Sequence, residues 1–540
     1  MTTDTEKILD SLTLDDMIGQ MLCFLMPRKA TEEQIEKIVS HTKAGSFFVS
    51  ANGQDEIKQC TKIIEKHTKL PALIAADIEA GPGHVWNAAV EPALPDVMAW
   101  GACDDPALIE KAHIATAEFC RRMGVHWSFA PIVDINFNPN NPVTNVRAIS
   151  DDPDEVIKIG RAAVRGLQKN GMIAAGCKHF PGDGVDDRNQ HFCTTVNSLS
   201  KEDWMNTYGK VYKAMIAEGV ASIMVAHIAL PAYDEKIDDR LGYPPATLSY
   251  HLQTDLLKGE LGFKGCIVSD ALSMIGASSV VPHDRLAVEF VKAGGDMLLF
   301  PLPEYFDQIK AAVLSGEIPT ERIRDAVRRV IEMKKRARLF EDEATVLADA
   351  THIDDAFTSA DEIAEKSLTL IRDCDHLLPL NIQPGDTVLL INLMKSKEYN
   401  PPHYSVTMDT VRQELERRGF VVKEYANPTR DDIAEDMKEA AVILINCKIS
   451  VRDYCGGNLR VNWEHIATFW RGEILRHPKL IFTSFGDPYK LYEYPYLKTY
   501  INAYSCSKPT QKAFVKAIVG EIPFRGKSPV ELKGFFKREV

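Results

Sequence analysis

Residues 172–193, MIAAGCKHFPGDGVDDRNQHFC, combine basic, acidic and imidazole side chains in one short stretch. An apolar run ends in Lys178 and His179, and a glycine-rich loop carrying His191 follows. The run is typical of a buried strand that the glycines and proline end abruptly. Lysine and histidine at a strand end can donate hydrogen bonds to a ligand, and a loop histidine can transfer protons near neutral pH. The alternative is a solvated surface turn.

Similar polar residues end other apolar runs in the first 340 residues: Asp77, Glu79, Asp134, His227 and Asp270. In a parallel barrel the carboxyl ends of the strands meet on one rim, where such proteins hold their substrates. Any one of these side chains could be a satisfied buried polar group, but so many on one rim are not expected by chance. The set predicts an active site.

The elements that must position these residues alternate between short apolar runs and amphipathic ones. About eight strand-helix units favour a (β/α)8 TIM-like barrel over a doubly wound sheet. No Gly-x-Gly-x-x-Gly follows the first strand, so no dinucleotide site is predicted. We expect strands at 17–25, 45–50, 72–77, 126–134, 174–180, 222–227, 266–270 and 296–300, and helices at 31–42, 54–67, 106–122, 153–169 and 201–217.

The chain becomes polar and acidic between 340 and 366, and a second alternation follows. We therefore expect a catalytic barrel at 1–340, a linker with a bridging helix at 341–365, and a smaller open α/β sandwich domain at 366–540. This second domain has no polar cluster comparable with the barrel rim. Its predicted strands are 367–371, 386–393, 420–425, 441–446, 479–484 and 499–503, with helices at 407–418 and 432–440.

Composition limits the classes of partner. A net charge of −13 argues against a nucleic-acid backbone, and no apolar run is long enough to cross a membrane. The amino terminus lacks the apolar core of a signal peptide, and the 11 cysteines include no CxxC pair. We expect a cytoplasmic protein that acts on a small molecule, and its oligomeric state stays open.

An ordered set of motifs resembles glycoside hydrolase family 3, in its β-N-acetylglucosaminidase branch, which is represented by the bacterial enzyme of peptidoglycan recycling. The resemblance covers essentially the whole chain, because two further segments are similar to the entry to and exit from the family's second domain. The motifs are AADIEAG (75–81), FAPIVDI (129–135), NPVTNVRAISDDP (141–153), KHFPGDG (178–184) with NQH (189–191), and IVSDALSM (267–274); the two segments are EIAEKSLTLIRD (362–373) and GEIPFRGKSPV (520–530).

The resemblance implies a role for each matching residue. Asp270 falls on the catalytic nucleophile, and His191 falls on the general acid/base of the loop. The residues that fall on sugar-binding positions are Asp77, Arg147, Lys178 and His179. Asp134 and His227 are assigned to a supporting shell around them. Lys178 and Asp77 could instead form an ion pair that stiffens the rim, and both roles can hold at once.

One position departs from the resembled branch, in which an aspartate stands two residues before the loop histidine. Here that residue is Asn189. An amide can fix the tautomer of the ring but supplies no charge to stabilise imidazolium. We therefore expect a slower enzyme than its relatives, unless Asp183, Asp186 or Asp187 replaces the missing charge.

The expected function is that of an exo-acting, retaining β-N-acetylglucosaminidase that acts on muropeptide- or chitooligosaccharide-type carbohydrates through a covalent glycosyl-enzyme. The alternatives are a phosphorylase of the same branch and a weakly active sugar-binding protein. A β-glucosidase is less expected, because that branch carries its acid/base in the second domain. A metal site at His179, Asp183, Asp187 and His191 fits no standard spacing, so no metal or cofactor is predicted.

Overall fold

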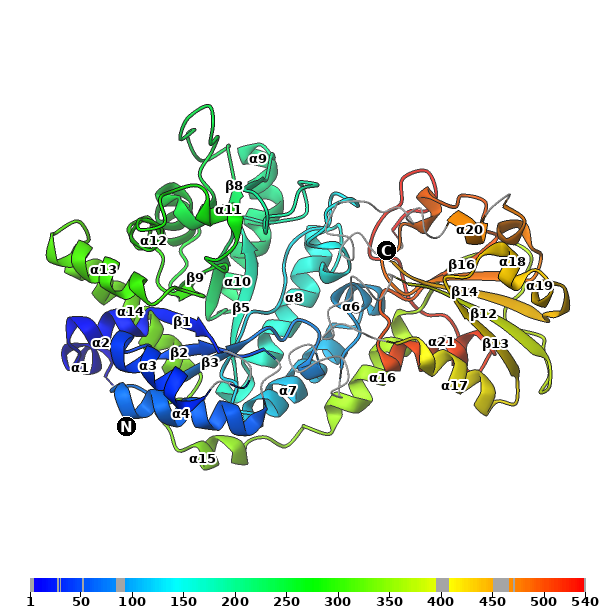
Figure 1. Ribbon diagram of the computed structural model, residues 1–540, viewed down its shortest axis with the longest axis horizontal. Helices are drawn as coiled ribbons and strands as arrows, with labels where there is room; N and C mark the ends of the chain where they lie inside the picture. Colours follow the sequence, from blue (N-terminus) through cyan, green and yellow to red (C-terminus); the bar gives the residue numbers. More distant parts are fainter. Residues whose placement is uncertain are drawn as a thin grey trace.

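The computed structural model contains a barrel and a second sheet domain, joined through helix α16 (Asp355–Ser367) (Figure 1). It describes residues 4–26, 29, 31–50, 53–83, 93–394, 407–449, 466–469 and 472–538. Within these ranges, none of the helices is both long and apolar enough to cross a membrane.

Eight parallel strands form the first sheet, in the order β10-β1-β2-β3-β4-β5-β7-β9. A parallel bridge between Val268 and Met297 links the two end strands, and Ser269 N donates to Met297 O at 3.0 Å. The predicted barrel is therefore confirmed. Its strands are β1 (Leu22–Leu25), β2 (Ser46–Phe48), β3 (Leu73–Ala76), β4 (Trp127–Ser128), β5 (Ala174–Phe180), β7 (Ser222–Val225), β9 (Cys266–Ser269) and β10 (Leu298–Leu299).

Helices cover the outside of the barrel, while large apolar side chains fill its interior. Phe48 and Phe129 stack there with ring centroids 5.6 Å apart, and Trp127 packs edge-on against Phe129. Two short strands, β6 (Thr195–Val196) and β8 (Ile228–Ala229), pair above the main sheet. The α-helices are α1 (Thr5–Asp10), α2 (Leu14–Gln20), α3 (Glu32–Thr42), α4 (Gln54–His67), α6 (Val97–Cys103), α7 (Pro106–Arg122), α8 (Pro153–Leu167), α9 (Lys201–Trp204), α10 (Lys210–Ala217), α11 (Ile275–Ser278), α12 (Leu286–Ala293), α13 (Glu304–Leu314), α14 (Thr320–Arg336) and α15 (Glu343–Ala348), and π-helices span Met205–Gly209 and His251–Glu260.

Two predicted strands are wrong in part. Residues 14–20 form helix α2 because Thr13 and Asp16 make a reciprocal capping box, so only Leu22–Leu25 is strand. The predicted strand 126–134 is regular only at Trp127–Ser128. Pro131 lacks the N–H that a ladder needs, and the irregular backbone beyond it leads to Asp134.

The second sheet has the order β11-β16-β15-β14-β12-β13, parallel except for β11 against β16. One face packs on barrel helix α6 through Met98, Ala99 and Ala102 (Figure 1). The other face packs on α16 and α21. The predicted helix 432–440 is two short ones, and Ser367 ends α16. The elements are β11 (Thr369–Asp373), β12 (Thr387–Met394), β13 (Val421–Ala426), β14 (Val442–Lys448), β15 (Leu480–Ser484), β16 (Thr499–Asn502), α17 (Asp409–Arg417), α18 (Arg430–Ile433), α19 (Asp436–Glu439), α20 (Ile466–Phe469) and α21 (Lys508–Ile518).

After α21 the chain returns to the barrel. Lys527 N donates to Ala102 O at 3.0 Å, and Ser150 Oγ donates to Pro529 O at 2.5 Å. Glu531 N donates to Asp151 Oδ2 at 2.8 Å. The barrel rim around residue 150 is thus held by the second domain.

Candidate active site

Strand β5 presents Lys178 at its carboxyl end. All its residues are buried, and the ammonium of Lys178 lies 2.7 Å from Asp77 Oδ1 and 2.7 Å from Glu79 Oε1. Burial opposes the charge, but the two carboxylates prevail and raise the pKa of Lys178. Lys178 is therefore a fixed cation at the rim.

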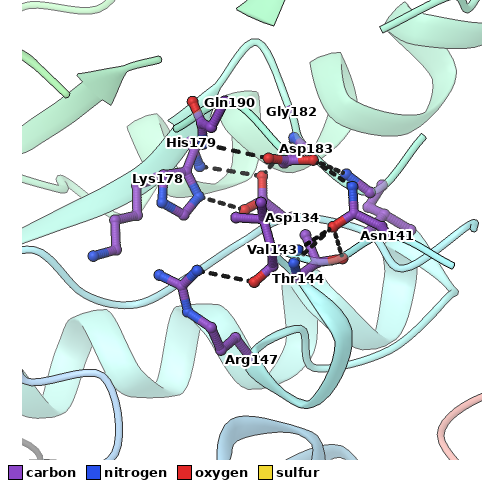
Figure 2. Close-up of polar contacts among 12 residues, drawn as sticks. Asp134, Asn141, Val143, Thr144, Arg147, Lys178, His179, Gly182, Asp183 and Gln190 are labelled. Atoms are coloured by element: carbon purple, nitrogen blue, oxygen red, sulfur yellow. Dashed lines mark hydrogen bonds and ion pairs between the residues drawn. The ribbon is translucent and has the colours of Figure 1, made fainter. Parts of the chain in front are cut away.

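Arg147 lies on the same rim and shares the carboxylate of Glu79. Its Nε and Nη2 donate to Glu79 at 2.8 and 2.7 Å, and Nη1 donates to Val143 O at 2.9 Å. Burial acts against the charge, and Glu79 more than offsets it, so the pKa of Arg147 is raised. Figure 2 shows the charged ends of Lys178 and Arg147 directed to the same side of the site. Two cations and two carboxylates can hold vicinal hydroxyls of a sugar.

Asp134 orients His179. Its Oδ2 lies 2.7 Å from His179 Nδ1, and its Oδ1 accepts from the backbone N–H groups of His179 and Asp183 at 3.1 and 2.8 Å. Because a carboxylate can only accept, His179 Nδ1 carries a proton, and the other ring nitrogen is left for a ligand. Figure 2 shows this contact at the centre of the site.

Asp270 follows strand β9 directly and is half-buried. Its Oδ1 accepts from Ala271 N at 2.7 Å. Burial opposes ionisation, but His227, His179, the Ala271 N–H and Lys178 together hold the pKa of Asp270 below its usual value. The carboxylate is ionised at neutral pH, as a nucleophile must be.

His227 lies fully buried at the end of β7, beside the Asp270 strand. Its Nδ1 is 2.8 Å from Thr247 Oγ1, and its Nε2 is 3.0 Å from Ala271 O. Burial lowers the pKa of His227, although Asp270 opposes this shift. The neutral ring thus braces the Asp270–Ala271 turn, and the N–H of Ala271 and the ammonium of Lys178 remain to stabilise the carboxylate at neutral pH.

His191 is exposed on the loop after β5. Its Nδ1 lies 2.6 Å from Asn189 Oδ1, and its carbonyl accepts from Ile275 N at 3.2 Å. The surrounding protein atoms disfavour the charged ring and lower the pKa of His191, although Asp270 acts in the opposite direction. An amide oxygen only accepts, so Nδ1 carries a proton and Nε2 is left to exchange one with a substrate.

None of the three aspartates considered as substitutes for the missing charge bonds to His191 among the contacts of the described residues. Asp183 accepts from Asn141 and Gln190, and Asp186 pairs with Arg188 at 2.5 Å. Among the residues that the structure describes, Asn189 is the one whose side chain contacts the His191 ring. In the same ranges of the chain, no three His, Cys, Asp or Glu side chains are grouped to hold a metal ion.

Three residues of the site were not among the predicted binding or supporting set. Glu79 joins Lys178 to Arg147, and only its place after a strand signalled it. Asn141 and Gln190 both donate to the buried Asp183 carboxylate, at 2.6 and 3.3 Å. Gln190 stands between Asn189 and His191 in the sequence, yet nothing in that position reveals that its side chain points inward.

An eight-stranded parallel barrel with polar side chains gathered at the carboxyl ends of its strands has the arrangement of a barrel enzyme. Residues 13–333 match the family model "Glycosyl hydrolase family 3 N terminal domain", so the chain belongs to glycosyl hydrolase family 3.

Two of the curated relatives carry names of one activity class. The chain is 30% identical to "Beta-N-acetylglucosaminidase/beta-glucosidase" of Cellulomonas fimi, over 96% of this chain and 93% of that protein. It is also 30% identical to "Beta-hexosaminidase A" of Pseudoalteromonas piscicida, over 50% of this chain and 48% of that protein. The predicted family membership is confirmed.

Two solved structures superpose over nearly the whole chain. A family 3 β-N-acetylglucosaminidase from Paenibacillus sp. has a TM-score of 0.83 and 26% identity, covering 97% of this chain and 99% of that one. A structure titled "Beta-glucoside phosphorylase BglX bound to 2FGlc" has a TM-score of 0.85 and 29% identity, covering 98% and 96%.

Proposed function

We propose that this protein is an exo-acting, retaining β-N-acetylglucosaminidase with Asp270 as nucleophile and His191 as general acid/base. The observation that carries the proposal is that a carboxylate and an oriented imidazole lie near each other on one rim: Asp270 ends strand β9, and the loop of His191 is tied to Ile275 just beyond it. Asp270 is held ionised by its neighbours, while burial lowers the pKa of His191 and the nearby Asp270 charge opposes that shift. A carboxylate and a titrating imidazole are the two groups that a double displacement needs.

In the first step a carboxylate oxygen of Asp270 bonds to the anomeric carbon as the bond to the leaving oxygen breaks. That oxygen takes the proton from Nε2 of the His191 imidazolium. In the second step Nε2 removes a proton from water, whose oxygen displaces Asp270 from the sugar. Asn189 Oδ1 accepts from Nδ1 in both steps and so holds the ring in one orientation.

The sugar is held by the pre-organised group Asp77, Glu79, Arg147, Lys178 and His179. Each member is bound to another member or to Asp134, so little side-chain entropy is lost when substrate binds. The names of the relatives suggest a terminal β-linked N-acetylglucosamine as the bound sugar. We propose that it is carried by a muropeptide- or chitooligosaccharide-type substrate, as the sequence resemblance implies.

The test is release of chromophore from 4-nitrophenyl β-N-acetylglucosaminide beside the β-glucoside, with Asp270→Ala as the control. We expect turnover of the N-acetyl substrate that the substitution abolishes. Preference for the glucoside would refute the substrate assignment, and undiminished activity of Asp270→Ala would refute the nucleophile.

Phosphorolysis is the second candidate, because a similar solved structure carries the name of a phosphorylase. In addition, Asn189 places an uncharged amide beside the His191 ring, where a carboxylate would repel an incoming phosphate. Phosphate would then attack the glycosyl-enzyme in place of water, and no proton need be removed from it. Product analysis with and without phosphate separates the two reactions, since only phosphorolysis yields the sugar 1-phosphate. Asn189→Asp should then suppress turnover by phosphate more than turnover by water.

A further inference from the structure

We propose that the second domain positions the proton-transfer loop of the barrel through a buried chain of hydrogen bonds from Tyr489 to Gln190. The role given to the loop rests on the proposed function, because it assumes that His191 is the acid/base. The links themselves join six residues of two domains.

The chain begins in the core of the second domain. Tyr489 is buried in its apolar cluster, and its backbone N–H donates to Asp487 Oδ1 at 3.1 Å. The phenol oxygen of Tyr489 accepts from Asn136 Nδ2 of the barrel at 2.5 Å. Asn136 Oδ1 in turn accepts from Thr144 Oγ1 at 2.8 Å. The second domain therefore fixes the barrel segment that follows β4.

Asn141 carries the chain to the loop base. Its Oδ1 accepts from Thr144 N at 2.7 Å and from Val143 N at 2.9 Å, so its amide orientation is fixed. The Nδ2 group must then face Asp183 Oδ1, to which it donates at 2.6 Å (Figure 2).

The other oxygen of Asp183 reaches the loop. Gln190 Nε2 donates to Asp183 Oδ2 at 3.3 Å, and Gln190 Oε1 accepts from His227 N at 3.1 Å. Gln190 is thus held inward at both ends of its amide while its neighbours Asn189 and His191 face the mouth. Asn136, Asn141, Thr144, Asp183 and Gln190 are each at most 2% exposed, so water cannot replace a lost link freely.

Each link has a defined donor and acceptor, and this makes a rescue experiment possible. In Asp183→Asn the amide oxygen still accepts from Asn141 Nδ2, but the amide nitrogen faces Gln190 Nε2, donor against donor. Adding Gln190→Glu places a carboxylate oxygen opposite that nitrogen and keeps the other oxygen on His227 N. The double variant therefore restores every link at unchanged net charge, whereas Gln190→Glu alone sets two carboxylates face to face.

The interdomain link is tested by Tyr489→Phe, which removes the acceptor of Asn136. The matched control is Tyr504→Phe, because Tyr504 is buried in the same cluster but its hydroxyl donates at 3.0 Å to Thr369 within the second domain. Hydrogen exchange of peptides that cover 186–194 reports loop order, whether or not the protein turns over a glycoside.

We expect faster exchange of 186–194 in Tyr489→Phe and Asp183→Asn, parent-like exchange in Tyr504→Phe, and recovery in Asp183→Asn/Gln190→Glu. In Tyr489→Phe and Asp183→Asn, kcat/KM for the phenyl N-acetylglucosaminide should fall about tenfold. For the 2,4-dinitrophenyl N-acetylglucosaminide, whose leaving group needs no acid, it should fall less than about twofold. Unchanged exchange in Tyr489→Phe, or no recovery in the double variant, would overturn the proposal. A parent protein that is inactive on both substrates would instead refute the proposed function, and the exchange data would still decide the positioning.

Discussion

Replacing Asn189 with aspartate tests the acid/base assignment most sharply. Asn189 Oδ1 lies 2.6 Å from His191 Nδ1, so the new carboxylate would face the ring at hydrogen-bond distance. Two unit charges about 4 Å apart attract by about 1 kcal/mol in water and about 4 kcal/mol near a protein surface. His191 is exposed, so about 1–2 kcal/mol applies, and about 1.4 kcal/mol corresponds to one pH unit.

The sign follows from the protonation state that each step needs. Cleavage of an unactivated glycoside requires imidazolium, whose fraction falls as pH rises through the pKa of His191. The carboxylate raises that pKa, so the alkaline limb of kcat/KM moves up by roughly one pH unit. Above the limb, kcat/KM for phenyl β-N-acetylglucosaminide should rise about three- to tenfold, because more of the enzyme then carries imidazolium. The gain stays below the full change in that fraction, since an imidazolium of higher pKa is a weaker acid.

The assay is the pH profile of kcat/KM for the phenyl and 2,4-dinitrophenyl glycosides in parent and variant. The activated substrate is the internal control, since its leaving group departs without a proton. A limb that does not move, or an equal gain on both substrates, would refute the reasoning and leave His191 without its proposed role.

Three further outcomes follow from the contacts of the rim. Glu79→Gln removes the anion shared by Lys178 and Arg147, so KM for the 4-nitrophenyl substrate should rise by about tenfold or more; an unchanged KM would exclude Glu79 from organising the sugar site. Gly276→Ala places a methyl group 2.4 Å from Gln190 O and 2.9 Å from Cys193 O, so it should displace the loop and lower kcat/KM for the phenyl glycoside selectively; equal loss on the dinitrophenyl glycoside would argue against this. Burial first, and then the charge of Asp134, raise the pKa of Asp183 to about 6. The folded protein therefore holds this proton more tightly than the unfolded chain, and stability falls by roughly 3 kcal/mol as pH rises from the usual carboxyl range to about 6. Urea unfolding of the parent should show this slope and Asp183→Asn should lose it; identical slopes would contradict the raised pKa.

The sequence predicts the barrel well because each strand end combines an apolar run with a chain-breaking turn. Strand β5 is predicted at its observed bounds, Ala174–Phe180, and helices α4 and α7 are predicted at theirs. The failures lie where a local contact overrides the apolar pattern. The capping box of Thr13 and Asp16 starts a helix in a segment whose apolar pattern predicts a strand. Pro131 interrupts the strand ladder before Asp134.

The rim residues at strand ends could be chosen from the sequence because the carboxyl ends of parallel strands meet on one rim of a barrel. Their partners could not, because a hydrogen bond between distant segments has no sequence signature. Asn136 and Tyr489 are 353 residues apart, and the inward turn of Gln190 depends on the backbone N–H of His227. The resemblance supplied roles for Asp270 and His191, which remain predictions until the variants are measured.

The return of residues 527–531 to the barrel has a consequence for synthesis on the ribosome. The rim segment around Ser150 and Asp151 emerges early, but its partners Pro529 and Glu531 are translated only after the entire second sheet. Amino-terminal domains generally fold first during translation. We therefore expect a nascent barrel that is compact but unfinished on this side, so that the sugar site gains its final shape only when residues 527–531 have left the exit tunnel.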